Sequence, residues 1–125
     1  MLFRSDVTVV TWGAMVHTAD EAASLADGLS VEIIDLRTVL PWDKEAVLAS
    51  VRKTSKVLVL HEDTHTGGFG AEIASRIMER CFLHLEAPVQ RVAGFDTIMP
   101  YYKLELEYLP DAERIGRAID ETAAY

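Results

Sequence analysis

Four side chains that could ligate a metal or transfer a proton lie within five positions of this chain: His61, Glu62, Asp63 and His65. They follow Val57–Leu60, an unbroken apolar run typical of a strand buried on both faces. Because alternate residues of a strand point to opposite faces, His61 and Asp63 could converge but all four could not. The spacing also differs from HExxH, the helical motif of zinc hydrolases. The sequence therefore favours a polar strand end over a metal site for hydrolysis.

A second candidate is the glycine-rich turn at Gly67, Gly68 and Gly70, at the start of an apolar helical periodicity over 69–82. Free backbone N–H groups at the start of a helix can bind an anion. TGGFG, however, matches neither GxGxxG nor the Walker pattern with its lysine. Glycines also permit a tight turn that would let Phe69 enter the core. The structural turn is the favoured interpretation, and an independent anion- or ligand-binding domain is the alternative.

The remaining reactive side chains form no catalytic set that can be read from the sequence. Cys81 lies on the apolar face of the predicted helix, which is typical of a small core residue rather than a nucleophile. His17 and His84 are isolated and are predicted to lie at the surface. Asp35 and Arg37 flank one residue and are predicted to form a structural ion pair. We therefore predict no catalytic residue in this stretch of chain.

The methionines and aromatic residues suggest packing and association. Met15, Met78 and Met99 are predicted to pack in the interior. Trp42 and the Tyr101–Tyr102 pair are predicted to be rigid amphipathic surfaces, of the kind enriched at interfaces. The residues alone thus favour association over catalysis.

The elements that position these side chains alternate along the chain. Strands are predicted at 7–12, 31–36, 57–60 and 89–93, and helices between 13 and 28, at 44–52, at 69–82 and from 111 nearly to 125. Asp43 and Asp111 are predicted helix N-caps. The stretch 94–110 is predicted to be an ordered surface excursion, because it is too apolar to be disordered. This alternation predicts an α/β domain with a largely parallel sheet and helices on both faces.

The composition excludes several classes of function. A net charge of −8 and a pI near 4.9 argue against a nucleic-acid partner and favour a basic protein partner. One cysteine excludes an internal disulfide framework and indicates a reducing, cytoplasm-like compartment. No apolar run approaches the ~18 residues of a membrane span, so no membrane partner is expected. The first residues, MLFRSD, lack a signal-peptide pattern, and we expect a bacterial-like cytoplasmic protein.

Three stretches together carry a family resemblance: VEIIDLRTVLPWD, HEDTHTGGFGAEIASRIMERCF and LEAPVQRVAGFDTIMPY. They resemble, in order and in spacing, the C-terminal domain of the beta subunit of thiamine-diphosphate-dependent 2-oxoacid dehydrogenases. This domain has the transketolase C-terminal-domain fold, and the resemblance extends from about Val7 to Tyr125. It is strongest to the branched-chain (2-oxoisovalerate) enzymes, while pyruvate and acetoin dehydrogenases stay open as alternatives. Transketolase and deoxyxylulose-phosphate synthase fit less well.

The resemblance implies a three-layer α/β/α sandwich with about five strands, mostly parallel and one antiparallel. Residues 7–125 would form this domain, with 1–6 as a boundary or tail and the thiamine-binding half of the subunit absent. The whole enzyme would decarboxylate a branched-chain 2-oxoacid, using thiamine diphosphate and Mg, and transfer the acyl group to a lipoyl group. The stretch in hand would bind no cofactor or metal and would be inactive alone.

The same resemblance implies the partners. They are an alpha subunit and a second beta subunit in a heterotetramer, and the small subunit-binding domain of the dihydrolipoyl acyltransferase. Relatives dock that domain with an acidic residue just before an Ala-Pro pair, here Glu86, and with the terminal carboxylate, here on Tyr125. A basic docking domain would suit an acidic chain, since charge-assisted contacts to carboxylates are strong.

Overall fold

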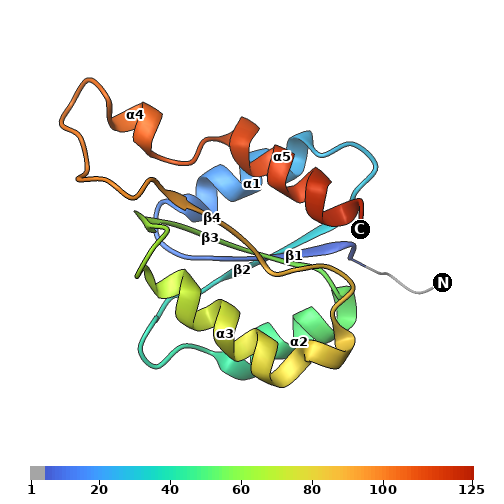
Figure 1. The fold of residues 1–125 in the computed structure, drawn as a ribbon. Helices are drawn as coiled ribbons and strands as arrows, with labels where there is room; N and C mark the ends of the chain where they lie inside the picture. Colours follow the sequence, from blue (N-terminus) through green and yellow to red (C-terminus); the bar gives the residue numbers. More distant parts are fainter. Residues whose placement is uncertain (1–4) are drawn as a thin grey trace.

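Four strands form one sheet, and helices cover both of its faces (Figure 1). The computed structural model describes residues 5–125, so the expected boundary at 1–6 lies mostly outside the described residues. The strands are β1 (Val7–Thr11), β2 (Val31–Asp35), β3 (Val57–Thr64) and β4 (Gln90–Gly94). The helices are α1 (Met15–Leu25), α2 (Lys44–Thr54), α3 (Phe69–Cys81), a 3-10 turn η1 (Phe82–His84), α4 (Glu105–Tyr108) and α5 (Ala112–Ala123).

The sheet has the order β2-β1-β3-β4, and every pair is parallel. The three-layer α/β/α prediction is confirmed, but the expectation of about five strands with one antiparallel is wrong for residues 5–125. The stretch that follows β4 forms a loop and the short helix α4 instead of a further strand. Two prolines, Pro100 and Pro110, interrupt this stretch, and proline cannot donate to a ladder of strands.

Two apolar cores lie on the two faces of the sheet. One lies between the sheet and α2 and α3, and the other between the sheet and α1 and α5 (Figure 1). Successive residues of β3 alternate between them, since Val57 and Val59 belong to the first core and Leu58 and Leu60 to the second. All four are fully buried, which explains the unbroken apolar run in the sequence.

Two aspartates begin helices as predicted. The side chain of Asp43 accepts a hydrogen bond from the Ala46 N–H at 3.1 Å, and that of Asp111 accepts one from the Arg114 N–H at 2.7 Å. Each satisfies an N–H group that a helix leaves without an internal partner. No helix within residues 5–125 is long and apolar enough to cross a membrane.

Several side chains lie where the sequence did not predict them. Trp42 was expected at the surface but is 7% exposed, because it packs in the core beneath α2 and α3. Met78 and Met99 were expected inside, yet both are exposed. Met78 lies on the outer side of α3, and Met99 lies in the excursion after β4, so neither faces the sheet. Met15 is buried as predicted.

Candidate functional site

The residues weighed as candidate metal and phosphate ligands lie at the carboxyl end of β3 and in the turn after it, and this strand runs four residues beyond its predicted end. His61 is 1% exposed, and its ring stacks on Trp12 with centroids 5.4 Å apart and an interplanar angle of 19°. Phe69 meets Trp12 edge-on at 5.9 Å. The helices that follow the neighbouring strands β1 and β3 pack on opposite faces of the sheet, α1 on one face and α3 on the other. At such a point α/β sheets usually bind ligands. In this protein the position is filled by its own aromatic side chains.

The glycines of the turn serve this packing. A Cβ on Gly68 would collide with the Thr64 carbonyl and the His61 ring, and one on Gly70 would collide with the same ring. Gly67 has a φ of +79°, in the left-handed region that favours glycine. The structural interpretation of TGGFG is therefore supported. Phe69 follows these glycines directly. Its side chain is partly buried against the core beneath α2 and α3, as predicted.

The imidazole of His61 is a buried neutral group. Burial lowers its pKa from 6.5, and the charge of Asp63 only partly offsets this effect. Neither ring nitrogen has a hydrogen-bond partner among residues 5–125. Glu62, Asp63 and His65 are exposed instead of converging on the ring. No group of three or more His, Cys, Asp or Glu side chains in the described chain could hold a metal ion.

These residues do not fit thiamine diphosphate or its Mg ion. A diphosphate at the glycine turn would need open space against the first N–H groups of α3. The His61 ring packs so closely on Gly68 and Gly70 that even a methyl group on either glycine would collide with it. Magnesium would also need convergent oxygen ligands, and the described residues gather no such set. No catalytic step is assigned to this turn.

The other single candidates have structural roles. Arg37 Nε donates to Asp35 Oδ2 at 2.9 Å, which confirms the predicted pair. Cys81 is fully buried as predicted, and burial raises the pKa of its thiol, which makes it a poor nucleophile. His17 and His84 are exposed as predicted.

The two predicted docking residues are brought to one edge of the sheet. The Glu86 N–H donates to the Ser55 carbonyl at 2.9 Å. Lys56 Nζ donates to the main-chain oxygen of Tyr125 at 2.7 Å and to that of Ala123 at 2.8 Å. Glu86 and Tyr125 are thus tied to consecutive residues just before β3, although they are 39 positions apart in the sequence. Both side chains are exposed, that of Tyr125 by 62%.

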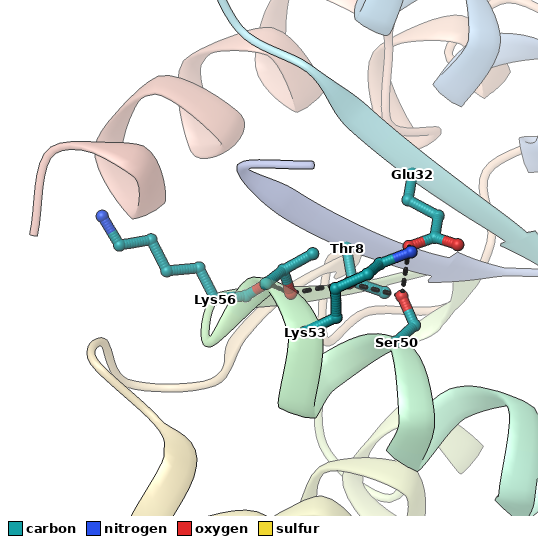
Figure 2. Close-up of polar contacts among 6 residues, drawn as sticks. Thr8, Glu32, Ser50, Lys53 and Lys56 are labelled. Carbon is teal, nitrogen blue, oxygen red and sulfur yellow. Dashed lines mark hydrogen bonds and ion pairs between the residues drawn. The ribbon is translucent and has the colours of Figure 1, made fainter. Parts of the chain in front are cut away.

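A chain of polar contacts supports this edge from inside (Figure 2). The Thr8 hydroxyl lies 2.8 Å from the hydroxyls of both Ser50 and Thr54. Thr54 donates to the Lys56 carbonyl at 3.0 Å, and Ser50 donates to Glu32 Oε2 at 2.8 Å. The network therefore joins β1, β2 and α2 to the residue that binds the end of α5.

An ion pair ends this network at the surface. Lys53 Nζ lies 2.6 Å from Glu32 Oε2 (Figure 2). The hydrogen bond from Lys53 lowers the pKa of Glu32, and the Ser50 hydroxyl acts in the same direction. Glu32 is therefore held ionised as an acceptor for both donors.

An apolar arm, defined here as residues 95–106, projects from the opposite edge (Figure 1). Ile98 is 90% exposed and Tyr101 93%, and Tyr102 and Leu106 are almost as open. The arm is anchored at Phe95, whose ring lies under the Arg114 guanidinium at 4.8 Å. A cavity of about 490 Å³ lies beneath the arm and the neighbouring Tyr108. Several exposed apolar side chains on one segment are typical of an interaction site.

Comparison with known proteins identifies the family of this fold. The model of the transketolase C-terminal domain matches residues 3–115. The chain belongs to the transketolase C-terminal domain family. It is 52% identical over 123 residues to the mitochondrial 2-oxoisovalerate dehydrogenase subunit beta 2 of Arabidopsis thaliana, and this match covers 97% of the chain and 34% of that protein. It is 46% identical over 123 residues to the pyruvate dehydrogenase E1 component subunit beta of Leifsonia xyli, covering 97% of the chain and 36% of that protein.

Among solved structures, this transketolase C-terminal domain resembles a split-gene transketolase in the form of an inactive beta4 tetramer. The TM-score is 0.76 and the sequence identity is 27%. The match covers 98% of this chain and 39% of the transketolase chain. The chain thus spans about a third of the length of the curated relatives that it matches. The resemblance to beta subunits of 2-oxoisovalerate dehydrogenase, expected from three sequence stretches, is confirmed.

The sequence did not single out Lys56, the residue of this transketolase C-terminal domain that holds the main chain at Tyr125. Lys56 stands alone before a strand, a position with no sequence signal for a contact to Tyr125, 69 positions away. Only the return of α5 along the sheet brings the two together.

Proposed function

We propose that the chain is the C-terminal assembly and docking domain of the decarboxylating component of a branched-chain 2-oxoacid dehydrogenase complex. The whole enzyme would oxidatively decarboxylate 2-oxoacids that arise in branched-chain amino acid catabolism and transfer the acyl group to a lipoyl acyltransferase. Similarity to a 2-oxoisovalerate dehydrogenase beta subunit supports this proposal. The catalytic step would belong to the parts of the enzyme outside this chain, which spans a third of that relative.

The observation that carries the docking role is the shared anchoring of Glu86 and Tyr125 on Ser55 and Lys56. Together they offer an acidic side chain and, in the proposed docking, a terminal carboxylate at one edge. A basic subunit-binding domain of the dihydrolipoyl acyltransferase would be attracted by these groups and by the net charge of −8. Lys56 would orient the Tyr125 carboxylate by holding one of its oxygens.

The assembly role is supported by the apolar arm. Exposed apolar residues such as Ile98 and Tyr101 lose contact with water when a partner covers them, which favours association. An alpha subunit and a second beta subunit would be those partners in the proposed heterotetramer. Thiamine diphosphate and Mg would bind elsewhere in that assembly, in a reducing cytoplasm-like compartment. In this proposal residues 7–125 are the domain and 1–6 its boundary.

The docking proposal is tested with Glu86→Gln and with a short Gly-Ser extension after Tyr125. Each change removes or displaces a carboxylate, so each should weaken binding of the isolated subunit-binding domain about tenfold or more in calorimetry at low salt. Glu62→Gln is the matched control, because Glu62 is also exposed but lies at the other end of β3. Equal affinities for all four proteins would remove Glu86 and Tyr125 from the docking site.

A pyruvate dehydrogenase is the second candidate, supported by 46% identity to a pyruvate dehydrogenase subunit beta. An acetoin dehydrogenase is the other alternative from the sequence. The two leading candidates differ in their partner, so subunit-binding domains from a branched-chain and from a pyruvate acyltransferase should be compared side by side. Tighter binding of the pyruvate-type domain would reverse the preference.

A further inference from the structure

A small pocket of about 180 Å³ lies between α2 and α3, on the face of the sheet away from α5. Four of the 12 lysine and arginine residues of this acidic protein line it: Lys44, Arg52, Arg76 and Arg80. We propose that this cavity, called here the basic pocket, binds a phosphate group, either free or carried on a small organic ester. The proposal is independent of the docking role, since it involves neither Glu86 nor Tyr125.

Three of the four basic side chains in the basic pocket have no ion pair among the described residues. Arg76 is the exception, since it pairs with Glu72 at 3.1 Å and with Glu79 at 3.4 Å. Arg52, Arg80 and Lys44 have no ion pair among residues 5–125. Glu45 is the one carboxylate that lines the pocket. A cluster of like charges repels itself, so an anion that enters it would be stabilised.

Helical spacing gathers these side chains. Lys44, Leu48 and Arg52 recur every fourth residue along α2, and Arg76 and Arg80 are separated by the same interval along α3. Residues four apart lie on one face of a helix. Because α2 packs beside α3 (Figure 1), side chains from both helices line the same pocket.

The floor of the basic pocket is apolar. Trp42 and Leu48 line it, and both belong to the core beneath the helices. An apolar floor lowers the local dielectric constant, which strengthens the attraction between guanidinium groups and a bound anion. It also offers contact to the organic part of an ester.

A phosphate group fits this combination better than a carboxylate. A guanidinium presents planar paired donors that match phosphate oxygens, and here three guanidinium groups line one cavity. A phosphate near neutral pH carries up to two charges and three strong acceptor oxygens, so it has enough acceptors for both Arg52 and Arg80, the two arginines of the pocket without an ion pair among residues 5–125. A single carboxylate offers one charge and two oxygens.

The test is an NMR titration of the chain with inorganic phosphate and with phenyl phosphate at constant ionic strength. The indole N–H signal of Trp42 should shift in a saturable way, while that of Trp12, at the carboxyl end of β1, should not move. If the pocket takes an ester, phenyl phosphate should bind severalfold more tightly, because Trp42 and Leu48 contact its ring. Tighter binding of inorganic phosphate would assign the pocket to the free anion.

Arg52→Gln and Arg80→Gln should each weaken phosphate binding about tenfold or more, since each removes charge-assisted hydrogen bonds. Arg117→Gln is the matched control, with the same loss of charge on an exposed residue of α5. All three variants should fold, because these side chains are exposed, and a thermal melt would verify this. The proposal would be overturned if sodium chloride shifted the Trp42 signal as much as phosphate does. It would also be overturned if Arg52→Gln and Arg80→Gln bound phosphate as tightly as the wild type and Arg117→Gln.

Discussion

The ring of His61 stacks on the indole of Trp12, 5.4 Å between centroids and nearly parallel. This contact joins the ends of β1 and β3 at the position where an α/β sheet would otherwise open toward a ligand. The contact also explains why residues 68 and 70 are glycines, because a Cβ at either position would collide with the His61 ring. Residues that resemble an active site in the sequence are therefore a packed junction in the structure.

The first prediction concerns pH. Burial lowers the pKa of His61 from 6.5, so below that pH the unfolded chain binds a proton that the folded chain resists. Stability contributed by the neutral ring should be complete above about pH 6.5 and fall as the pH drops toward the lowered pKa. The slope is bounded by about 1.4 kcal/mol per pH unit for one proton. Urea denaturation at pH 7.5, 6.5 and 5.5 would measure it.

His61→Gln should remove this slope, whatever its effect on stability at neutral pH. His17→Gln is the matched control, because it removes an exposed imidazole and leaves His61 in place. Parallel profiles for the wild type and His61→Gln would contradict the assignment of a buried neutral imidazole.

The second prediction concerns the glycine turn. Gly70→Ala should destabilise the fold by about 1–3 kcal/mol, because the new methyl group collides with the His61 ring. Gly116→Ala should be neutral or stabilising by about 0.5–1 kcal/mol, since a Cβ at this position within α5 meets no atom within 4 Å. Thermal or urea unfolding measures both changes.

A double variant separates collision from other causes. In a chain that carries His61→Ala, the ring is gone, and the additional cost of Gly70→Ala should shrink. An unchanged cost in the double variant would show that the ring is not the obstacle.

The third prediction concerns the ion pair at the end of the buried hydroxyl network. Lys53→Met should reduce stability by less than about 1 kcal/mol at pH 7, because both charged groups are partly exposed. The pKa of Glu32 is lowered, so the contribution of the pair is present above its ordinary value of 4.5 and is lost as the pH falls through the lowered pKa. Wild type and variant should therefore converge as the pH falls below the lowered pKa of Glu32.

NMR titration of the Glu32 side chain provides the direct readout. Its pKa should rise in Lys53→Met, because the hydrogen bond from Lys53 is the largest cause of the shift. A pKa that stays in place would assign the shift to the Ser50 hydroxyl instead, and Ser50→Ala would then move it.

The fourth prediction concerns the end of α5. Lys56→Met removes two hydrogen bonds to main-chain oxygens and a cation from the negative end of a helix dipole. The loss should be about 0.3–1 kcal/mol, concentrated in the last turn. Hydrogen exchange of the Ala124 amide, which bonds to the Asp120 carbonyl, should accelerate. Lys103→Met in the apolar arm should leave that amide unchanged.

Local sequence was sufficient wherever a residue's neighbours along the chain decide its environment. The apolar run at Val57–Leu60 predicted a doubly buried strand, and Asp43 and Asp111 predicted helix starts, because both signals are local. Trp42 was misplaced, since its burial depends on α2 and α3 closing over it. The prediction of a fifth strand was also wrong. The exposed arm after β4 pairs with no strand of the sheet among the described residues.

The sequence by itself determined the fold class and, through three stretches with family-like order and spacing, the family. Hydrophobic periodicity and motif spacing depend only on the order of residues along the chain. The tertiary structure decided what the conspicuous residues do. It placed the His61 ring against Trp12 and two glycines, and it brought Tyr125 to Lys56 across 69 positions. These contacts join strands and helices remote in the chain, and only the order and packing of the sheet bring such residues together.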